Sequence, residues 1–503
     1  MKSINLKVYL VNIILVLLVL GFSLSLYSKV VPIPEYVDSL DNLKIAFNLT
    51  KYHQFSASNI NGDLTTKERD TLAFFAPNIQ KPVTVYEAQP TALREPLPIY
   101  ITSLILKKLD LINKYPNVQS LNAGKPLMLI KSQNFIYLLL LFTGLVMLLG
   151  QFIQHPLLKV FATLILLILV SQHLTGSMYF LLSTELLASV LMVWCCYFLI
   201  QAIQKQRLND WLLAGVMYGL LVLTKAAFIY IGVVLVASLL IYFTYLRQHR
   251  HFKGLCCFVL ISTIVVIPWM VRNYQQLHFF GVSERAADVL LVRAKKNLMT
   301  PIERKGAICV YTANEVLRPA CAKYFGFNNN DLSSTGRLKR LLRGSEEDKK
   351  ARSEMNPEKA ISFYFHATTI AYRARFDAYL KQQSIIVANQ ATSKLAMQAI
   401  LQHPIDHLIS TLLFAWRGLN VRYADIYTYF GFFALIAMGG LGLAKQRPQF
   451  LMVALLPTLA FAFYAFLSHF IPRYADPFIP FWMLAVVVTL YGFCKYFLSL
   501  FRR

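Results

Sequence analysis

Long runs of apolar residues, separated by short polar stretches, dominate the pattern along this chain. A helix needs about 20 mostly apolar residues to cross a bilayer. Stretches close to that length and character lie at 9–27, 133–153, 157–174, 177–203, 254–270, 427–444, 449–467 and 476–498. A further run from Trp211 to Leu246 would measure about 54 Å as one helix, which is too long for a single crossing. We interpret it as a hairpin of two short helices turning near Thr224 and Lys225, so ten spans are predicted.

Short basic stretches beside these runs predict which way the chain crosses the membrane. "QKQR" at 204–207 precedes the hairpin and "RQHRHFK" at 247–253 follows it. Short loops rich in Lys and Arg favour the cytoplasm, so both termini are expected there. The first span follows Lys2 and Lys7 and has no small-x-small cleavage signature after it, so 1–27 is interpreted as an anchor rather than a removed signal peptide.

The same pattern divides the chain into five parts: the first transmembrane anchor (1–27), the first periplasmic loop with amphipathic interfacial helices (28–132), transmembrane helices 2–7 (133–270), a large basic periplasmic segment (271–426), and transmembrane helices 8–10 with a cytoplasmic C-terminus (427–503). Helices are predicted at 38–50 and in "REPLPIYITSLILKKL" (94–109), which is entered through prolines. In the large segment, "HPIDHLISTLLFAW" (403–416) is short for a span and is interpreted as an interfacial helix.

Composition supports an all-α polytopic membrane protein. Of the 503 residues, 56% are hydrophobic and only 15% charged, whereas soluble domains carry about 25% charged residues. The formal charge of +25 could indicate nucleic-acid binding, but the chain has no zinc-finger or RNA-binding motif. The basic residues lie in short loops and in 271–426, which holds 23 Lys and Arg against 13 Asp and Glu. We therefore attribute the charge to topology and to anionic lipid headgroups, and expect no nucleic-acid partner.

The seven cysteines divide into two groups by their surroundings. Five lie in apolar runs, where cysteine usually acts as a small hydrophobic residue. Cys309 and Cys321 instead lie in the large polar segment. A disulfide is plausible if that segment is extracytoplasmic, and two free thiols are the alternative.

Polar residues at the predicted outer ends of the spans are the candidates for chemistry. An acidic cluster, Glu35, Asp38 and Asp41, directly follows the first span. Further candidates at the same depth are Arg94, Glu95, Glu185 (a little inside the fourth span), Lys225, Arg272, Arg473 and Tyr474. Cations would bind a lipid phosphate and a carboxylate would accept a proton. The alternative is that Asp38 and Asp41 only charge the first turn of a helix, Arg272 anchors at the interface, and Arg94 with Glu95 is a surface pair.

Several stretches together resemble one family. "DSLDNLKIA", "REPLPIY", "LLSTELLASVL", "LLAGVMYGLLVLTKAAF", "IPWMVRNYQQLHFFGVS" and "PRYADPFIPFWML" occur in the order seen in GT-C glycosyltransferases. The chain is most similar to the bacterial members related to glycosyltransferase family 39, the protein O-mannosyltransferases and lipid A aminoarabinose transferases. This resemblance implies a GT-C fold and an enzyme that uses a polyprenyl-phosphate sugar. The segment 285–400 carries none of the resemblance.

In this family an acidic residue of the first outer loop is the proposed base, within the pattern Asp-Glu-x-x-Tyr-x-x-x-Ala. With Ala46 as anchor, Asp38 takes the Asp position, while Ser39 and Asn42 replace the Glu and the Tyr. The missing second acid puts a metal role of an acid pair in doubt. Asp38 is therefore the expected base and Asp41 the alternative, while Glu35 is expected to be only a loop residue.

Together these inferences predict a membrane glycosyltransferase of the bacterial inner membrane with a periplasmic site. It would transfer a hexosyl or pentosyl group, with inversion, to lipid A, another glycan or a protein. Asp38 would act as base, and Lys225, Arg272 and Arg473 would hold the donor phosphate. No cofactor is certain, and a divalent metal is left open. Alternatives are a transporter or flippase of lipid-linked sugars, an O-antigen polymerase or ligase-like enzyme using a diphosphate donor, and a non-catalytic scaffold.

Overall fold

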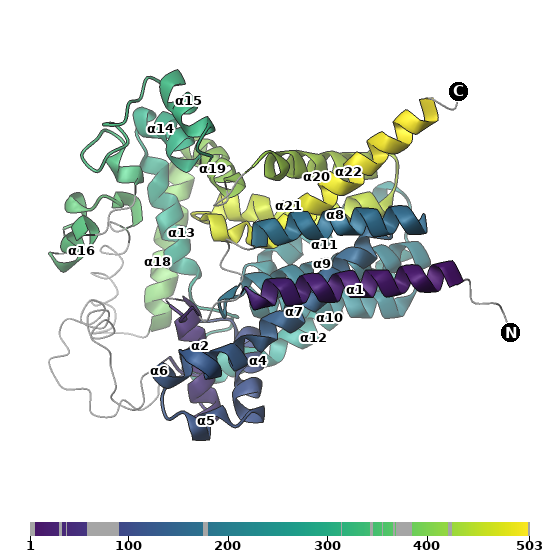
Figure 1. The fold of residues 1–503 in the computed structure, drawn as a ribbon. Coiled ribbons are helices and arrows are strands. Elements are labelled where there is room, and N and C mark those ends of the chain that lie inside the picture. The colour runs from purple at the N-terminus through teal and green to yellow at the C-terminus, as the bar shows by residue number, and fades with distance from the viewer. Residues whose placement is uncertain are drawn as a thin grey trace.

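The fold is described from a computed structural model, which is all-helical over the residues it describes (Figure 1). Those residues are 6–29, 33–36, 38–57, 90–174, 180–312, 314–342, 346–354, 356–365, 368, 385–420 and 425–500. Within them, nine helical stretches are long and apolar enough to cross a membrane. They contain α1 (Leu6–Ser28), α7 (Gly124–Leu149), α8 (Pro156–Leu174), α9 (Glu185–Lys205), α11 (Phe228–Tyr245), α12 (His251–Leu277), α20 (Ile426–Ala444), α21 (Pro448–Leu467) and α22 (Ile479–Leu500). The predicted all-α polytopic class is confirmed.

The predicted hairpin is present and supplies a tenth apolar helix, α10 (Leu208–Thr224), of 17 residues. Helix α10 ends at Thr224 and α11 begins at Phe228, so the turn falls at Lys225 as expected. Helix α10 packs closely on α12. At Gly215 the two backbones approach so closely that a Cβ atom there would lie only 2.8 Å from the carbonyl oxygen of Phe258. The hairpin therefore belongs to the bundle although each helix is short.

The predicted start of the fourth span is wrong. The fourth span was expected at 177–203, but α9 begins at Glu185 and residues 180–184 are not α-helical. Thr184 is the N-cap residue of α9, a position that hydroxyl residues favour, and its side chain makes no capping hydrogen bond here. Glu185 therefore lies at the start of α9 and not inside it.

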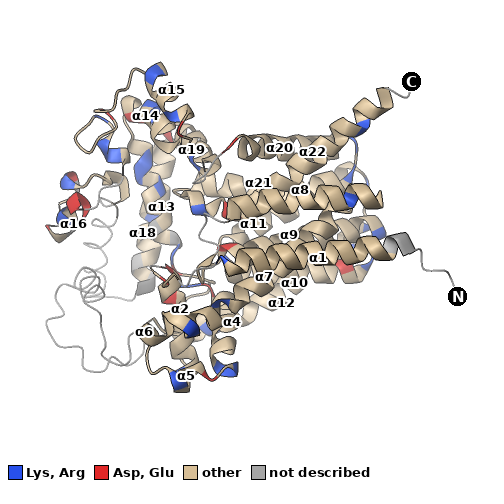
Figure 2. Cartoon of the chain, viewed as in Figure 1, with Lys and Arg blue, Asp and Glu red and all other residues tan. Residues whose placement is uncertain are grey.

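The spanning helices run side by side, and the N-terminal end of α1 and the C-terminal end of α22 lie at the same end of the bundle (Figure 1). Acidic and basic residues gather at the two ends of the bundle and in the helices beyond one end, while the middle is almost free of them (Figure 2). This distribution is the one a bilayer requires of spanning helices. The chain is a multi-pass membrane protein.

Two extramembrane segments lie at the opposite end from the chain termini (Figure 1). The first holds α2 (Asp38–Tyr52), α4 (Pro96–Lys108), α5 (Leu111–Lys114) and α6 (Val118–Leu121). Helices α2 and α4 pack on each other, and the Thr50 hydroxyl lies 2.8 Å from that of Ser103. Both helices lie where the sequence predicted them.

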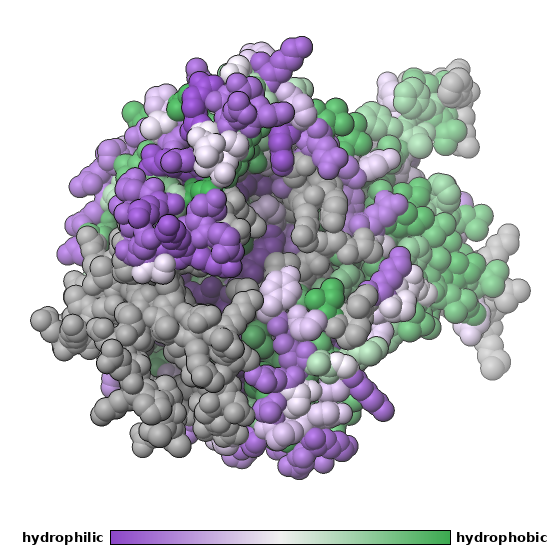
Figure 3. All heavy atoms as spheres, turned by 60° about the vertical axis from the view of Figure 1, so that its left-hand side comes forward, coloured by the Kyte–Doolittle hydropathy of each residue, from purple (hydrophilic) through white to green (hydrophobic). Residues whose placement is uncertain are grey.

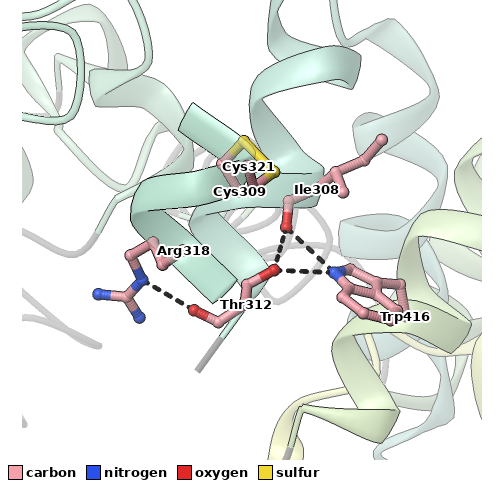
Figure 4. The surroundings of a disulfide bond; sticks show 6 residues. All are labelled: Ile308, Cys309, Thr312, Arg318, Cys321 and Trp416. Carbon is pink, nitrogen blue, oxygen red and sulfur yellow. Dashed lines mark hydrogen bonds between the residues drawn. A yellow bond between two sulfur atoms is a disulfide. The ribbon is translucent and has the colours of Figure 1, made fainter. Parts of the chain in front are cut away.

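The second segment is larger and contains α13 (Ala286–Lys295), η2 (Lys296–Leu298), α14 (Pro301–Tyr311), α15 (Leu317–Tyr324), η3 (Lys339–Leu341), α16 (Glu346–Ser353), η4 (Pro357–Lys359), α18 (Ile385–Gln402) and α19 (Pro404–Leu419). Cys309 and Cys321 form a disulfide that joins α14 to α15 (Figure 4). Beside it, Trp416 of α19 donates from Nε1 to the carbonyl oxygen of Ile308 at 3.0 Å. The stretch 403–416, predicted to be an interfacial helix, is part of α19.

A fully buried arginine joins this second segment to the bundle. Arg293 of α13 donates to Asn297, to Ser410, to Thr411, to the carbonyl oxygen of His407 and to that of Ala465 in α21. Its guanidinium also lies 4.7 Å from the centre of the Phe414 ring. We call this group the Arg293 hub.

Candidate active site

The candidate site begins at the first turn of α2, at the junction of the bundle and the extramembrane helices. Asp38 is the first residue of α2, and Asp41 lies three residues further on in the same first turn. Acidic side chains are favoured there because backbone N–H groups point toward the helix start. Asn42 donates to the carbonyl oxygen of Leu182 at 2.8 Å and thereby ties α2 to the stretch before α9.

Three arginines from distant parts of the chain converge on Asp38. Arg94 Nη2 lies 2.6 Å from Asp38 Oδ1, and Arg285 Nη2 lies 3.5 Å from the same oxygen. Arg473, in η5 (Pro472–Tyr474), contacts the other oxygen, Oδ2. Arg94 also pairs with Asp41. The structure therefore gathers one carboxylate and three guanidinium groups, which we call the Asp38 cluster.

These charges decide the protonation of Asp38. Burial acts to raise the pKa of Asp38, but the positive charges of Arg285, Arg94 and Arg473 outweigh burial and hold the pKa well below its usual range. The carboxylate is therefore ionised at any physiological pH. While the three contacts persist, it is also a weak proton acceptor, since protonation would forfeit them.

Asp38 and Asp41 are not equivalent. The side chain of Asp38 is 18% exposed and has three cationic partners, whereas that of Asp41 is 34% exposed and pairs with Arg94. Asp41 therefore has the weaker claim to a catalytic role. Ser39, which stands where the family has a second acid, is buried, and its hydroxyl donates to the carbonyl oxygen of Tyr36.

A second ion pair lies beside the Asp38 cluster. Lys225 Nζ, at the hairpin turn, lies 3.3 Å from Glu185 Oε1, and both side chains are buried. Lys225 also faces the ring of Tyr474 at 5.7 Å, and the guanidinium of Arg473 lies 5.6 Å from that ring. Tyr474 thus connects this pair to the Asp38 cluster. Seven of the sequence candidates therefore lie together: Asp38, Asp41, Arg94, Glu185, Lys225, Arg473 and Tyr474.

Glu95 lies near the same pair, whereas Arg272 has other surroundings. Glu95 is the N-cap residue of α4, makes no side-chain capping hydrogen bond, and interacts electrostatically with Lys225. Arg272 donates to the carbonyl oxygens of Thr91 at 2.9 Å and of Phe55 at 3.4 Å, and it lies over the ring of Trp269. Arg272 therefore holds the loop that carries Arg94, and in the described residues it makes no contact with Asp38.

Two charged residues have roles that sequence reasoning missed. Arg285 directly precedes α13, in the segment without family resemblance, and no motif marks it. The interpretation of Glu35 as only a loop residue is wrong. Glu35 is buried, lies 2.8 Å from Lys131, and accepts from the backbone N–H of Leu182 at 2.9 Å. A buried acid needs such partners, and its apolar neighbours in the sequence did not reveal them.

The residues around Asp38 do not suit a metal ion. In the part of the chain that the structure describes, no three His, Cys, Asp or Glu side chains could hold one. Both Asp38 oxygens face guanidinium groups, which would repel a cation.

The face that carries the extramembrane segments is hydrophilic over much of its described area, and a hollow with hydrophilic walls opens near its centre (Figure 3). The fold and the site define a class: all-α multi-pass membrane proteins with clustered arginines and carboxylates at one end of the bundle.

A comparison with known families is consistent with this class. The family model described as "Dolichyl-phosphate-mannose-protein mannosyltransferase" matches residues 134–271, which run from α7 into α12. Over these residues the chain is similar to that family, and the predicted resemblance to GT-C glycosyltransferases is confirmed. The matched part includes Glu185 and Lys225, whereas Asp38, Arg285 and Arg473 lie outside it.

Two solved structures are distantly similar. The archaeal oligosaccharyltransferase AglB from Archaeoglobus fulgidus, in complex with an inhibitory peptide and a dolichol-phosphate, has a TM-score of 0.46 and 12% identity, covering 97% of this chain and 51% of that one. The apo form of the Archaeoglobus fulgidus oligosaccharyltransferase has a TM-score of 0.33 and 11% identity, covering 95% and 51%. This chain spans about half the length of these structures. No curated protein matches the chain in sequence.

Proposed function

We propose that this protein is a membrane glycosyltransferase that takes a sugar from a polyprenyl-phosphate donor and transfers it to an envelope acceptor. The convergence of Arg94, Arg285 and Arg473 on Asp38 is the observation that supports this proposal best. It combines a carboxylate with several phosphate-binding groups beside the ends of the spanning helices, where the headgroup of a membrane lipid would arrive.

In the proposed reaction, Asp38 accepts the proton of the acceptor hydroxyl while the oxygen attacks the anomeric carbon. A new C–O bond forms to the acceptor, and the bond from the anomeric carbon to the phosphate oxygen breaks. Its electron pair leaves with the phosphate, whose growing negative charge the guanidinium groups stabilise. Direct attack inverts the anomeric configuration. The acceptor is lipid A, a polysaccharide or a protein.

The neighbouring residues would complete the site. Lys225 lies close enough to Tyr474 and Glu185 to add positive charge beside Arg473. The carboxylate of Glu95 makes no capping bond and is available to hydroxyl groups of the sugar or the acceptor. Arg272 would act indirectly, by holding the loop that carries Arg94.

We place the site on the periplasmic side of a bacterial inner membrane. The disulfide between Cys309 and Cys321 supports this, because disulfides persist in oxidising compartments. The basic loops at 204–207 and 247–253 support it as well, since short basic loops favour the cytoplasm.

The test is release of polyprenyl phosphate from a polyprenyl-phosphate sugar by the purified protein, with acceptor glycolipid present. Asp38→Asn should lower the rate about 10²- to 10⁴-fold, the usual contribution of a general base. The protein should stay folded and inserted, as judged by gel filtration.

Asp41→Asn is the matched control, because it removes the same charge from the same helix turn. It should lower the rate much less than Asp38→Asn. Near-normal transfer by the Asp38→Asn variant would overturn the assignment of the base. Sugar-lipid movement across vesicles without release of polyprenyl phosphate would favour a transporter.

A further inference from the structure

The arginines of the Asp38 cluster are incompletely satisfied. Each contacts Asp38 through a single nitrogen, Nη2, although a guanidinium has five N–H donors arranged as a fork. In the described part of the chain, the Nε atoms of Arg94 and Arg473 are buried and have no hydrogen-bond acceptor. The side chain of Arg94 is only 7% exposed. Buried N–H groups of a cation normally have partners, so these donors point to a ligand.

The charge of the cluster indicates the sign of that ligand. The three guanidinium groups contact two carboxylates, those of Asp38 and Asp41, so the contacting groups carry one excess positive charge. Arginine forks match the spaced oxygens of a phosphate and bind them through two parallel N–H groups. A phosphate group offers more acceptor oxygens than a single carboxylate, and it can reach donors that Asp38 leaves unused.

We infer that Arg94, Arg285 and Arg473 form a receptor for the phosphate of a polyprenyl phosphate, free or esterified to a sugar, and that Asp38 occupies part of this receptor when the lipid is absent. This inference rests on the proposed function for the identity of the lipid, a polyprenyl-phosphate sugar. Donor phosphate displaces Asp38 from Arg285 and Arg473, and the released carboxylate turns to the acceptor hydroxyl.

The exchange couples the two substrates. Asp38 becomes an effective proton acceptor only after the donor has taken over its arginine partners, since those contacts suppress its basicity. After transfer, the returning carboxylate competes with polyprenyl phosphate for the same guanidinium groups and favours release of the product. Arg285 brings the second extramembrane segment into the phosphate site, a role that no family motif indicates.

The experiment measures binding of polyprenyl phosphate to the full-length protein in nanodiscs, without sugar or acceptor. If Asp38 competes with phosphate, Asp38→Asn binds polyprenyl phosphate more tightly, by about tenfold. Arg285→Gln and Arg473→Gln each bind it about tenfold more weakly or worse. Arg304→Gln is the control for charge, because Arg304 pairs with Asp406 in the second segment and should leave the affinity unchanged.

Equal or weaker binding by a folded Asp38→Asn variant would overturn the inference. If that variant does not fold, the Arg285→Gln variant provides the test. The Arg285 side chain is 41% exposed, so its loss is compatible with folding. Unchanged affinity of Arg285→Gln for polyprenyl phosphate would overturn the inference. Inorganic phosphate is the second probe and should compete only weakly. Competition as strong as that of the lipid would overturn the assignment of the receptor to a lipid phosphate.

Failure of the proposed function has a different signature. In that case no polyprenyl-phosphate sugar is cleaved by the wild-type protein, yet Asp38→Asn still binds polyprenyl phosphate more tightly. Failure of this inference instead leaves cleavage intact and removes the difference in affinity between wild-type and Asp38→Asn.

Discussion

Two groups of arginines lie near the same end of the bundle, and they differ in how their N–H groups are used. In the Arg293 hub, one fully buried guanidinium of α13 donates to five neutral oxygens from η2, α19 and α21. In the Asp38 cluster, three guanidinium groups share two carboxylates, and two of their buried Nε atoms have no acceptor among the residues that the structure describes. Every N–H group of Arg293 therefore has an acceptor within the chain, whereas some N–H groups of the Asp38 cluster have none among the described residues.

This difference separates a structural arginine from a site arginine by physical criteria. Five satisfied donors hold Arg293 in one position, and the contacts link helices that are far apart in the sequence. Unused donors and excess charge cost stability in a free protein and are retained where a ligand supplies the missing partners. Loss of Arg293 should therefore affect folding, and loss of a cluster arginine should affect catalysis.

The largest effect on stability is expected from Arg293→Ala. The substitution leaves several buried oxygens without donors, at roughly 1–3 kcal/mol each, and it opens a cavity beside Phe414. We expect the free energy of unfolding to fall by about 3 kcal/mol or more. Thermal unfolding in detergent measures this loss, and a variant of normal stability would contradict the description of Arg293 as a hub.

The largest effect on activity among the arginines is expected from Arg473→Gln. The glutamine keeps a polar side chain but removes the charge that faces Asp38 and the donor phosphate. Transfer should fall about 10²-fold, as for loss of one stabilising donor, while the unfolding temperature changes little. A large drop in stability with normal turnover per folded molecule would mean that Arg473 belongs with Arg293.

A pH effect should distinguish the two groups as well. Burial, together with the charge of Arg293, lowers the pKa of His407 to about 4 from its ordinary 6.5. Between these pH values the unfolded chain binds a proton that the folded protein excludes. Stability from this residue is full above about pH 6.5 and should fall by about 2 kcal/mol between pH 7 and pH 5. Thermal melts across this range test the effect, and His407→Gln should flatten the slope.

The smallest effect is expected from Arg304→Gln. Arg304 Nη2 lies 2.7 Å from Asp406 Oδ1, and the two side chains are 25% and 32% exposed. Ion pairs of this kind contribute little, so the loss in unfolding free energy should stay below about 0.5 kcal/mol. If the unfolding temperature of Arg304→Gln fell as far as that of Arg293→Ala, the difference in stability between the Arg293 hub and an exposed ion pair would be contradicted.

The architecture was largely predictable from local pattern. Length and apolar character identified the spanning helices, including the hairpin around Lys225. The error at 177–203 arose because apolar residues continue before Glu185 although Ser183 and Thr184 favour a helix start. A hydropathy average over the length of a span does not detect the residues at which a helix begins.

The candidate site was predictable only in part. Asp38, Arg94 and Arg473 were identified by their position at span ends, and the structure brings them together. Arg285 was missed because it lies in a segment without recognisable pattern. Glu35 was underrated because burial of an acid depends on partners such as Lys131 from another helix.

The sequence by itself determined that this is a polytopic helical membrane protein with acids and bases beside its span ends, because hydrophobicity and charge act locally along the chain. Only the tertiary structure decided which charges meet. Asp38 and Arg473 are 435 residues apart, and their contact follows from how α2 and the start of the last span pack at one end of the bundle. No periodicity in the sequence encodes that packing, so the identity of the cluster and its unused donors became visible only in the folded chain.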